Sequence, residues 1–360
     1  MYFIIKIHII VLSVLLLSSC ASKPTEASVA YGDFPQTIAL KGTTVPVDTA
    51  LFRYPFRIRV QGDKVAVMDL HSTDHFCHLF HYPDFRYLAS LGKRGEAPGE
   101  VLSSENIRWN GEFLWLLDAG KSEINRYGVS LSGDSLSRQE AVKIDEEVLR
   151  ALDFVQYDDS TFIIPDYSGD SRFCLINRKG HLLRRVGTIP TGNADALQNA
   201  RPALAQAWRS FIDYNPRNGV LAAVTQLGEV LEVYNLKDST HVVCIGPHGE
   251  PEFKVSEGYG IPTGIMGFND VQVTDKAIYA VFNGISFKKI MQNVRKDTFA
   301  DGGQYIYVFS LQGEPLCKYV LDHYIYGISV NESEGIIYAT DVNQDDPIIK
   351  YKMKYKRREI

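Results

Sequence analysis

Short apolar runs separated by turn residues recur along most of the chain. Each unit consists of an apolar run, a polar turn, a second run ending in a polar residue, a loop, a third run with aromatic residues, and a fourth run. In the first copy these runs fall at residues 56–60, 65–69, 76–82 and 87–91. Runs of this length bounded by turn residues are typical of β-strands. The pattern therefore predicts units of four antiparallel strands.

The residue that closes the second strand of each unit recurs at a regular spacing. The six positions are Asp69, Asp118, Asp166, Thr225, Asn283 and Asp341. Successive positions are 48 to 59 residues apart. Four-stranded units repeating at such a period are the signature of a β-propeller. We therefore expect an all-β fold, a six-bladed β-propeller of four-stranded antiparallel blades over residues 33–356.

The last unit lacks a fourth strand at the C-terminal end of the chain. Residues 34–40 form a spare apolar strand near the N-terminus that belongs to no unit. An unpaired strand edge invites association with other chains. We therefore expect this N-terminal strand to complete the last blade and close the ring.

The first 19 residues are typical of a signal peptide. Lys6 precedes an apolar run that ends at Leu17, followed by Ser18-Ser19-Cys20. The run is shorter than the roughly 20 apolar residues that a membrane-spanning helix needs. The sequence Leu17-Ser18-Ser19-Cys20 resembles the lipobox of bacterial lipoproteins. That resemblance implies cleavage before Cys20 and attachment of a diacylglyceryl group to its thiol.

The segment after Cys20 is polar and small, which predicts a flexible tether over residues 20–32. No Asp follows Cys20, so nothing signals retention at an inner membrane. We expect a lipid-anchored protein of the cell envelope, held at the outer membrane, with the leaflet left open.

Charge and cysteine content narrow the possible partners. The chain has 38 Lys and Arg against 43 Asp and Glu residues. A mildly acidic body does not favour binding to nucleic acid, which requires a basic surface. The four remaining cysteines, Cys77, Cys174, Cys244 and Cys317, contain no C-x-x-C pair and lie among apolar residues. We expect buried thiols, with a long-range disulfide as the alternative.

Several segments resemble those of known six-bladed propellers. Residues 91–100 read LGKRGEAPGE, which is similar to the Gly-rich inter-blade loop of NHL- and TolB-like propellers, and residues 245–253 repeat it faintly. The expected strand at residues 114–118 and the segment 124–127 also resemble the corresponding segments of these propellers. The chain resembles in particular the lipoproteins of this kind from Bacteroides-type bacteria. The resemblance implies a fold and an envelope location, and it implies no reaction.

All long insertions are expected on one face of the propeller. They lie at residues 92–106, 188–209, 247–268 and 284–303, in connections that share a face, whereas the other turns are short. Long loops on a rigid scaffold commonly carry function. We therefore expect the long-loop face to be the working face.

The insertion at 193–208 has apolar residues at helical spacing, with Pro202 able to interrupt the helix. It predicts a small helical cover over the channel. Trp208 and Arg209 are candidate ligand contacts, although Trp208 could instead hold this cover in place.

Other candidate site residues are cationic, aromatic or acidic. His71 and His75 lie in or beside a loop of the expected working face and could serve a ligand or a metal. Arg53, Arg57, Tyr324 and Tyr326 are expected around the channel mouth. The recurring Asp69, Asp118, Asp166 and Asp341 could bind a cation such as Ca²⁺. More commonly, an Asp at a strand end accepts backbone N–H bonds and fixes the following turn.

These patterns favour a non-enzymatic binding or scaffold protein that uses the long-loop face to hold an envelope protein, peptide or glycan. The alternative is a metal-assisted hydrolase or lyase, similar to lactonases, with its site in the channel. No G-x-S-x-G nucleophile motif and no phosphate-binding glycine loop is present in the sequence. We expect no cofactor, with Ca²⁺ or Zn²⁺ as the open alternatives.

Overall fold

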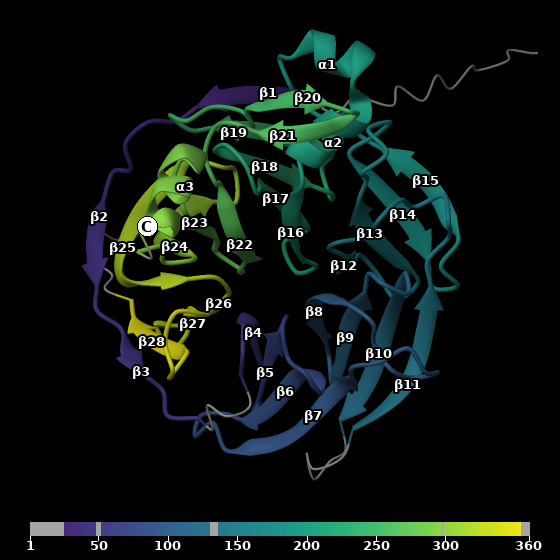
Figure 1. Ribbon diagram of the computed structural model, residues 1–360, viewed down its shortest axis with the longest axis vertical. Coiled ribbons are helices and arrows are strands. Elements are labelled where there is room, and N and C mark those ends of the chain that lie inside the picture. Colours follow the sequence, from purple (N-terminus) through teal and green to yellow (C-terminus); the bar gives the residue numbers. More distant parts are fainter. Residues whose placement is uncertain (1–24, 48–51, 130–135, 297, 354–360) are drawn as a thin grey trace, which may run out of the picture.

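A computed structural model describes residues 25–47, 52–129, 136–296 and 298–353. Six sheets surround a central channel, with the first strand of each sheet innermost (Figure 1). The six-bladed propeller predicted from the repeat spacing is therefore confirmed. The expected signal peptide, Cys20 and the last three residues of the predicted 33–356 domain lie outside the described residues.

The first three blades each contain four antiparallel strands, running from the channel outward. Blade one contains β4 (Pro55–Gln61), β5 (Lys64–Asp69), β6 (His75–His81) and β7 (Tyr87–Lys93). Blade two contains β8 (Ser104–Asn110), β9 (Phe113–Asp118), β10 (Glu123–Val129) and β11 (Leu136–Lys143). Blade three contains β12 (Val155–Gln156), β13 (Thr161–Pro165), β14 (Phe173–Asn177) and β15 (Leu182–Val186).

The last three blades each add a strand from the N-terminal segment. Blade four contains β16 (Ser210–Asn215), β17 (Val220–Thr225), β18 (Val230–Asn235) and β19 (Thr240–Ile245). Blade five contains β22 (Phe268–Val273), β23 (Ala277–Phe282), β24 (Gly303–Ser310) and β25 (Pro315–Ile325). Blade six contains β26 (Ile328–Asn331), β27 (Ile336–Thr340) and β28 (Ile348–Lys352).

The N-terminal segment runs around the outside of these three blades (Figure 1). β1 (Thr25–Ala30) pairs in parallel with β19, and β2 (Thr37–Leu40) pairs in parallel with β25. β3 (Thr43–Thr44) pairs with β28 and supplies the fourth strand of blade six. An N-terminal strand thus completes the last blade as predicted.

Two details of the N-terminal prediction need correction. The completing strand is β3, whereas the predicted segment 34–40 contains β2, which extends blade five instead. Residues 25–30 form a strand, although the sequence assigned them to the flexible tether of residues 20–32. Both differences have one cause: each outer strand offers a free row of backbone hydrogen-bonding groups, and the N-terminal segment pairs with three of them in turn.

The long insertions form small additional elements in the connections predicted to share one face. They are α1 (Ala194–Asn199), α2 (Arg201–Ala207), the hairpin of β20 (Phe253–Ser256) and β21 (Tyr259–Pro262), and α3 (Phe287–Arg295). Asn193 caps α1 by accepting a hydrogen bond from the Ala196 amide, and Pro202 occupies the first turn of α2. The predicted break of the helical cover near Pro202 is therefore confirmed.

The helical cover does not lie over the channel, as the sequence suggested. Leu204 and Trp208 of the cover pack against Val230 and Val243, which belong to β18 and β19 of blade four. The apolar residues of the cover therefore seal this blade instead of the central opening.

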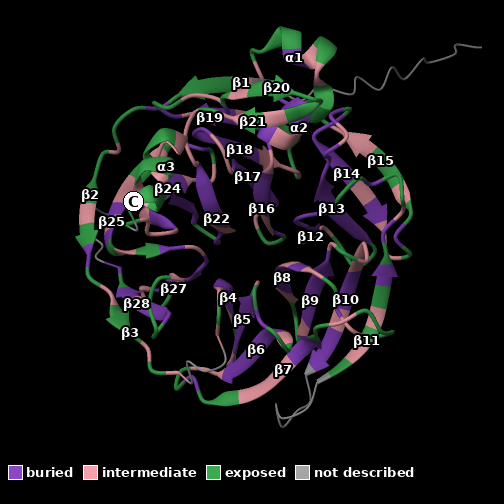
Figure 2. Cartoon of the chain, viewed as in Figure 1, coloured by how far each residue is buried: buried purple, intermediate pink, exposed green. Residues whose placement is uncertain are grey.

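Burial follows the blade order, with the inner strands buried and the outermost strands largely exposed (Figure 2). Cys77, Cys174 and Cys244 are buried, Cys317 is half-buried, and all four thiols are free. Burial raises the pKa of Cys317 to about 11, so this thiol stays protonated at neutral pH. The predicted unpaired thiols are confirmed. Within the described ranges, no helix has the length and apolar character needed to cross a membrane.

Candidate functional site: the channel mouth and the long-loop face

The recurring Asp residues at the ends of the second strands fix the loops around them. In blade one, Asp69 accepts backbone N–H bonds from Arg53 at 2.5 Å, Tyr54 at 2.9 Å and His71 at 3.0 Å. Asp69 is fully buried, so these amides supply the hydrogen bonds that water would otherwise provide. Its carboxylate thereby joins the incoming inter-blade segment to the turn that follows β5.

The same arrangement recurs in blade two. Asp118 accepts N–H bonds from Leu102 at 2.8 Å, Ser103 at 3.0 Å and Lys121 at 3.1 Å. The repetition explains why a carboxylate stands at the same position in successive units. It corresponds to the turn-fixing interpretation of these carboxylates.

Asp166 and Asp341 are also engaged locally. Asp166 accepts hydrogen bonds from the Ser168 amide at 2.9 Å and the Ser171 hydroxyl at 2.6 Å. Asp341 accepts one from the Asn343 amide at 2.9 Å and lies 2.9 Å from Nδ1 of His323. In the part of the chain that the structure describes, no three His, Cys, Asp or Glu side chains form a group suited to a metal ion.

Ionic side chains on and beside the inner strands form a largely buried network around the centre of the propeller. Its members are Arg57, Arg59, Arg108, Asp153, Asp213 and Asp270. Two hydrogen bonds of 2.8 and 2.9 Å join Arg59 to Asp270, and Arg108 lies 2.7 Å from Asp213 and 3.1 Å from Asp153. These pairs connect blades one and five, two and four, and two and three.

The charges in this network depend on one another. Burial lowers the pKa of Arg57 to about 10, against the opposing effect of Asp270. Burial alone would raise the pKa of Asp270, but Arg57 and Arg59 bring it below its usual value. Three arginines and three aspartates give a balanced set of charges. The network links five of the blades to one another through buried ion pairs.

Aromatic residues surround a cavity of about 240 Å³ at the channel mouth. The Tyr54 hydroxyl donates to Asp301 at 2.5 Å, and the Tyr326 hydroxyl donates to the same carboxylate at 3.2 Å. The Tyr326 and Phe56 rings are 4.9 Å apart, and His71 meets the Tyr54 ring edge-on at 4.9 Å. Asp301 therefore orders the tyrosines from the insertion above them.

The predicted site residues fall into separate groups. His71, Arg209 and Tyr326 all line the channel-mouth cavity, and Arg209 lies 3.5 Å from Glu105 there. Arg53 and His75 instead line a different cavity, of about 310 Å³, beside blade one. The structure thus brings three of the candidates together and places these two elsewhere.

Three other candidates do not face either cavity. Arg57 is fully buried beneath the channel mouth, with its guanidinium 3.9 Å from the centre of the Phe56 ring. Trp208 is 1% exposed within the core of the helical cover, so it packs the cover in place, which was the alternative to ligand contact. Tyr324 is 38% exposed at the end of β25 and does not line the channel mouth.

Sequence reasoning missed most of the aromatic lining of the channel mouth. Phe56, Phe211 and Phe268 line this cavity from the inner strands of blades one, four and five. The recurring polar position that closes the second strand of each blade serves as a reference. Each of the three phenylalanines pairs with the residue just before that position, or is next in sequence to the residue that does. Aligning the repeats on those strand ends would have revealed an aromatic residue at the same inner-strand position in three units.

Most of the exposed large apolar side chains among the described residues lie on the long-loop face. The structure describes twelve large apolar side chains as exposed. Seven lie in connections on this face, namely Leu102, Leu149, Val255, Tyr259, Ile261, Met291 and Val294. Tyr324 stands at the end of β25 nearest the same face. Tyr259 alone is 61% exposed, which is unusual for a residue held in a strand.

Comparisons with known proteins agree with this architecture. A structure of an exported protein from Bacteroides fragilis is similar with a TM-score of 0.56 and 10% identity, covering 91% of this chain and all of that one. A member of the DUF4221 family from Bacteroides vulgatus is similar with a TM-score of 0.55 and 10% identity, covering 89% of this chain and 98% of that one. At such identity these likenesses show the fold alone.

Comparison with curated protein sequences gives no match. The model of one family, described as TolB-like 6-blade propeller-like, matches residues 33–333. This span covers most of the chain and five complete blades with part of the sixth. The chain therefore belongs to the TolB-like six-bladed propeller family.

Proposed function

We propose that this chain is a lipid-anchored envelope protein that binds a protein or peptide through its long-loop face, as a binding or scaffold module without catalysis. The observation that carries the proposal is that eight of the twelve exposed large apolar side chains among the described residues lie on that face. Exposed apolar surface rimmed by polar residues commonly marks an interaction site.

The insertions give this surface a defined character. No residue of α3 is buried, and Met291 and Val294 are 57% and 55% exposed. Lys288 and Lys289 lie on the same short helix, so a partner with apolar and acidic groups would complement it. In Figure 1, α3 and the β20–β21 hairpin lie over blades five and four.

The channel mouth adds polar specificity beside the apolar insertions. Tyrosine and arginine are enriched where interfaces gain most of their binding energy. Tyr54, Tyr326 and Arg209 line this cavity. A partner side chain entering the mouth would meet these aromatic and cationic groups, which favours holding a ligand there.

The binding face is tested by photo-crosslinking in intact cells. A photoreactive amino acid at Tyr259 should give a discrete adduct, while the same residue at Leu316, which is 39% exposed on β25 away from the insertions, should give none. The adduct at Tyr259 should disappear when Met291 and Val294 are both changed to Ser. Equal labelling at both positions, or none at Tyr259, would contradict the proposed face.

The envelope location is tested separately. The fold neighbour from Bacteroides fragilis is described as exported, which supports this part of the proposal. A single acyl chain binds membranes only weakly, whereas several chains anchor a protein stably. The native chain should therefore pellet with membranes and the Cys20→Ser variant should not. A Cys317→Ser variant is the matched control, and membrane association of Cys20→Ser would disprove the anchor.

A further inference from the structure

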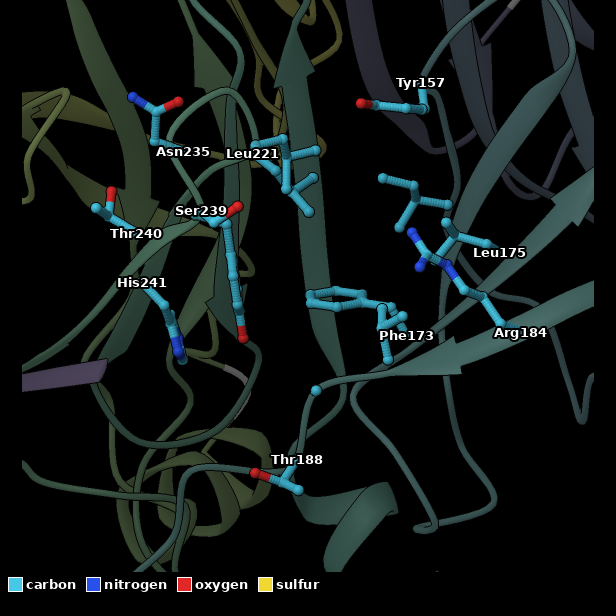
Figure 3. Close-up of a pocket in the computed structure, with 15 residues that line it drawn as sticks. Tyr157, Phe173, Leu175, Arg184, Thr188, Leu221, Asn235, Ser239, Thr240 and His241 are labelled. Carbon is cyan, nitrogen blue, oxygen red and sulfur yellow. The ribbon is translucent and has the colours of Figure 1, made fainter. Parts of the chain in front are cut away.

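A third cavity opens between blades three and four, away from the channel mouth. Its volume is about 640 Å³, which lies within the roughly 300–1,000 Å³ typical of small-molecule sites. Figure 3 shows side chains from both blades facing this space. Tyr157, Ile163, Phe173 and Leu175 line it from blade three, and Leu221 and Tyr234 line it from blade four.

The two blades pack against each other at the base of the gap and diverge beyond it. Phe173 and Tyr234 meet edge-on with ring centres 5.3 Å apart. Ala223 is fully buried in the same cluster and contributes little volume. Tyr157 meets Tyr214 of blade four with ring centres 5.6 Å apart, yet Tyr157 and Leu175 are only half-buried. The walls of the gap are therefore apolar and its outer part is unfilled.

One cationic side chain points into this apolar space. Arg184 on β15 is the cross-strand partner of Leu175, so both side chains lie on the same face of the sheet. Figure 3 shows Arg184 extending toward the space between Tyr157, Phe173 and Leu221. Its guanidinium makes no ion pair or hydrogen bond with any residue that the structure describes. An arginine with no partner beside an apolar wall is suited to a carboxylate or another anionic group.

Nearby negative charge does not compete for Arg184. Glu232 is fully buried at the base of blade four, and Arg172 holds it with contacts of 2.7 and 2.8 Å. His241 is 8% exposed, stacks on Tyr234 with ring centres 3.9 Å apart, and its Nε2 lies 3.6 Å from the Glu232 carboxylate. Among the described residues around this apolar space, the Arg184 guanidinium is therefore the cation left for a ligand.

We propose that this gap binds a single-chain anionic amphiphile, a molecule with an aliphatic body and a carboxylate head. The apolar walls take the aliphatic body, and Arg184 takes the carboxylate through two N–H donors. The site lies between blades, apart from the long-loop face, so it is independent of the function proposed above.

The probe is decanoate, titrated calorimetrically into residues 21–360, which retain every described element. One saturable site is expected. Octanoate should bind about fifteenfold more weakly, because each CH₂ group removed costs about fourfold in affinity. Decan-1-ol, which has the same chain without the charge, should bind at least about tenfold more weakly.

Variants locate the site. Leu175→Trp fills the gap and should abolish binding, while Leu183→Trp, at an unpaired position of β15 that is 55% exposed and outside the lining of the gap, should leave it unchanged. Arg184→Gln should weaken decanoate binding about tenfold and remove the preference over decan-1-ol, whereas Lys179→Gln should change neither. Thermal unfolding confirms that each variant is folded. Absence of saturable decanoate binding, or unchanged binding by Leu175→Trp, would overturn the proposal.

Discussion

Two neighbouring gaps between blades show how the same architecture is either sealed or left open. Between blades two and three, Trp115 meets Phe162 edge-on with ring centres 5.2 Å apart. Arg126 and Arg178 lie over the Trp115 ring and share the carboxylate of Glu140, at 3.2 and 2.6 Å. A large ring fills the gap, and a paired cation closes its outer edge.

Between blades three and four, the Phe173–Tyr234 ring pair fills only the base of the gap, and the paired cation at the outer edge is not repeated. Small and aliphatic side chains, Ala223 and Leu221, occupy the facing strand, and Arg184 has no carboxylate partner among the described residues. The two gaps share the same backbone arrangement. They differ in the volume of the side chains that fill them and in whether the arginine at the edge has a carboxylate partner, and these differences decide whether a gap is sealed or can accept a ligand.

The largest expected difference concerns the rings that fill the sealed gap. Trp115→Ala should destabilise the protein by about 3–5 kcal/mol, because Trp115 is 2% exposed and its removal leaves a cavity. Leu175 borders space that is already empty, so Leu175→Ala should lower the free energy of unfolding by about 1 kcal/mol or less. Urea unfolding measures both values. Equal losses would show that the two gaps are equally packed.

Each of the two gaps contains a carboxylate, Glu140 in the sealed gap and Glu232 in the open gap, and these two should contribute differently to stability at acid pH. Burial would raise the pKa of Glu232, but Arg172 and hydrogen bonds from His241 and Tyr234 lower it to about 2. A depressed carboxyl pKa stabilises the fold above the unfolded value of 4.5, and this stability is lost as the pH falls from 4.5 toward 2.

In the Glu232→Gln variant, the free energy of unfolding should therefore fall less steeply as the pH is lowered from 4.5. At pH 7 the variant should be about 3 kcal/mol less stable, because Arg172 is left buried without its partner. Glu140→Gln should cost about 1 kcal/mol or less, because the Glu140 side chain is 24% exposed to solvent. Unfolding measured from pH 3 to 7 checks both. If the free energy of unfolding of the Glu232→Gln variant still falls steeply at acid pH, another titratable group controls the acid stability.

Filling the open gap should be nearly neutral for stability. Leu175→Trp places a ring in existing space and should change the free energy of unfolding by less than about 1 kcal/mol, with a gain where the ring packs well. Adding bulk to the sealed gap through Val142→Trp, at a residue 1% exposed, should destabilise by about 1–3 kcal/mol. Similar losses for both would argue against the open volume.

The smallest effect is expected from metal chelation. The strand-end carboxylates on either side of the sealed gap, Asp118 and Asp166, already accept hydrogen bonds from their own loops. Treating residues 21–360 with EDTA should leave the melting temperature unchanged, with elemental analysis made on the same sample. Loss of near-stoichiometric Ca²⁺ or Zn²⁺ with a falling melting temperature would instead support a metal site.

The sequence predicted the blades because each unit repeats a local pattern. The regular placement of residues such as Asp69 and Asp118 reflects a loop contact that every such unit needs. The partners of β2 and β3 were harder to assign, because pairing at a blade edge depends on where the chain passes and not on apolar periodicity.

The channel mouth was only partly predictable, and the gap between blades was not. Tyr326 and Arg209 were identified from their loops, but Asp301, which orders Tyr54 and Tyr326, lies in an insertion that has no counterpart in other units. The open gap depends on the volumes of side chains in two blades that are distant in sequence. No local pattern around Arg184 shows that its guanidinium lacks a carboxylate.

Hydrogen–deuterium exchange of residues 21–360, with and without decanoate, tests most directly the claim that one gap is sealed and the other accepts a ligand. Decanoate should slow amide exchange in β14, β15, β18 and β19 and leave β10 and β11 unchanged. Leu175→Trp should remove this protection. Equal protection around both gaps, or none in the strands around Arg184, would contradict the account.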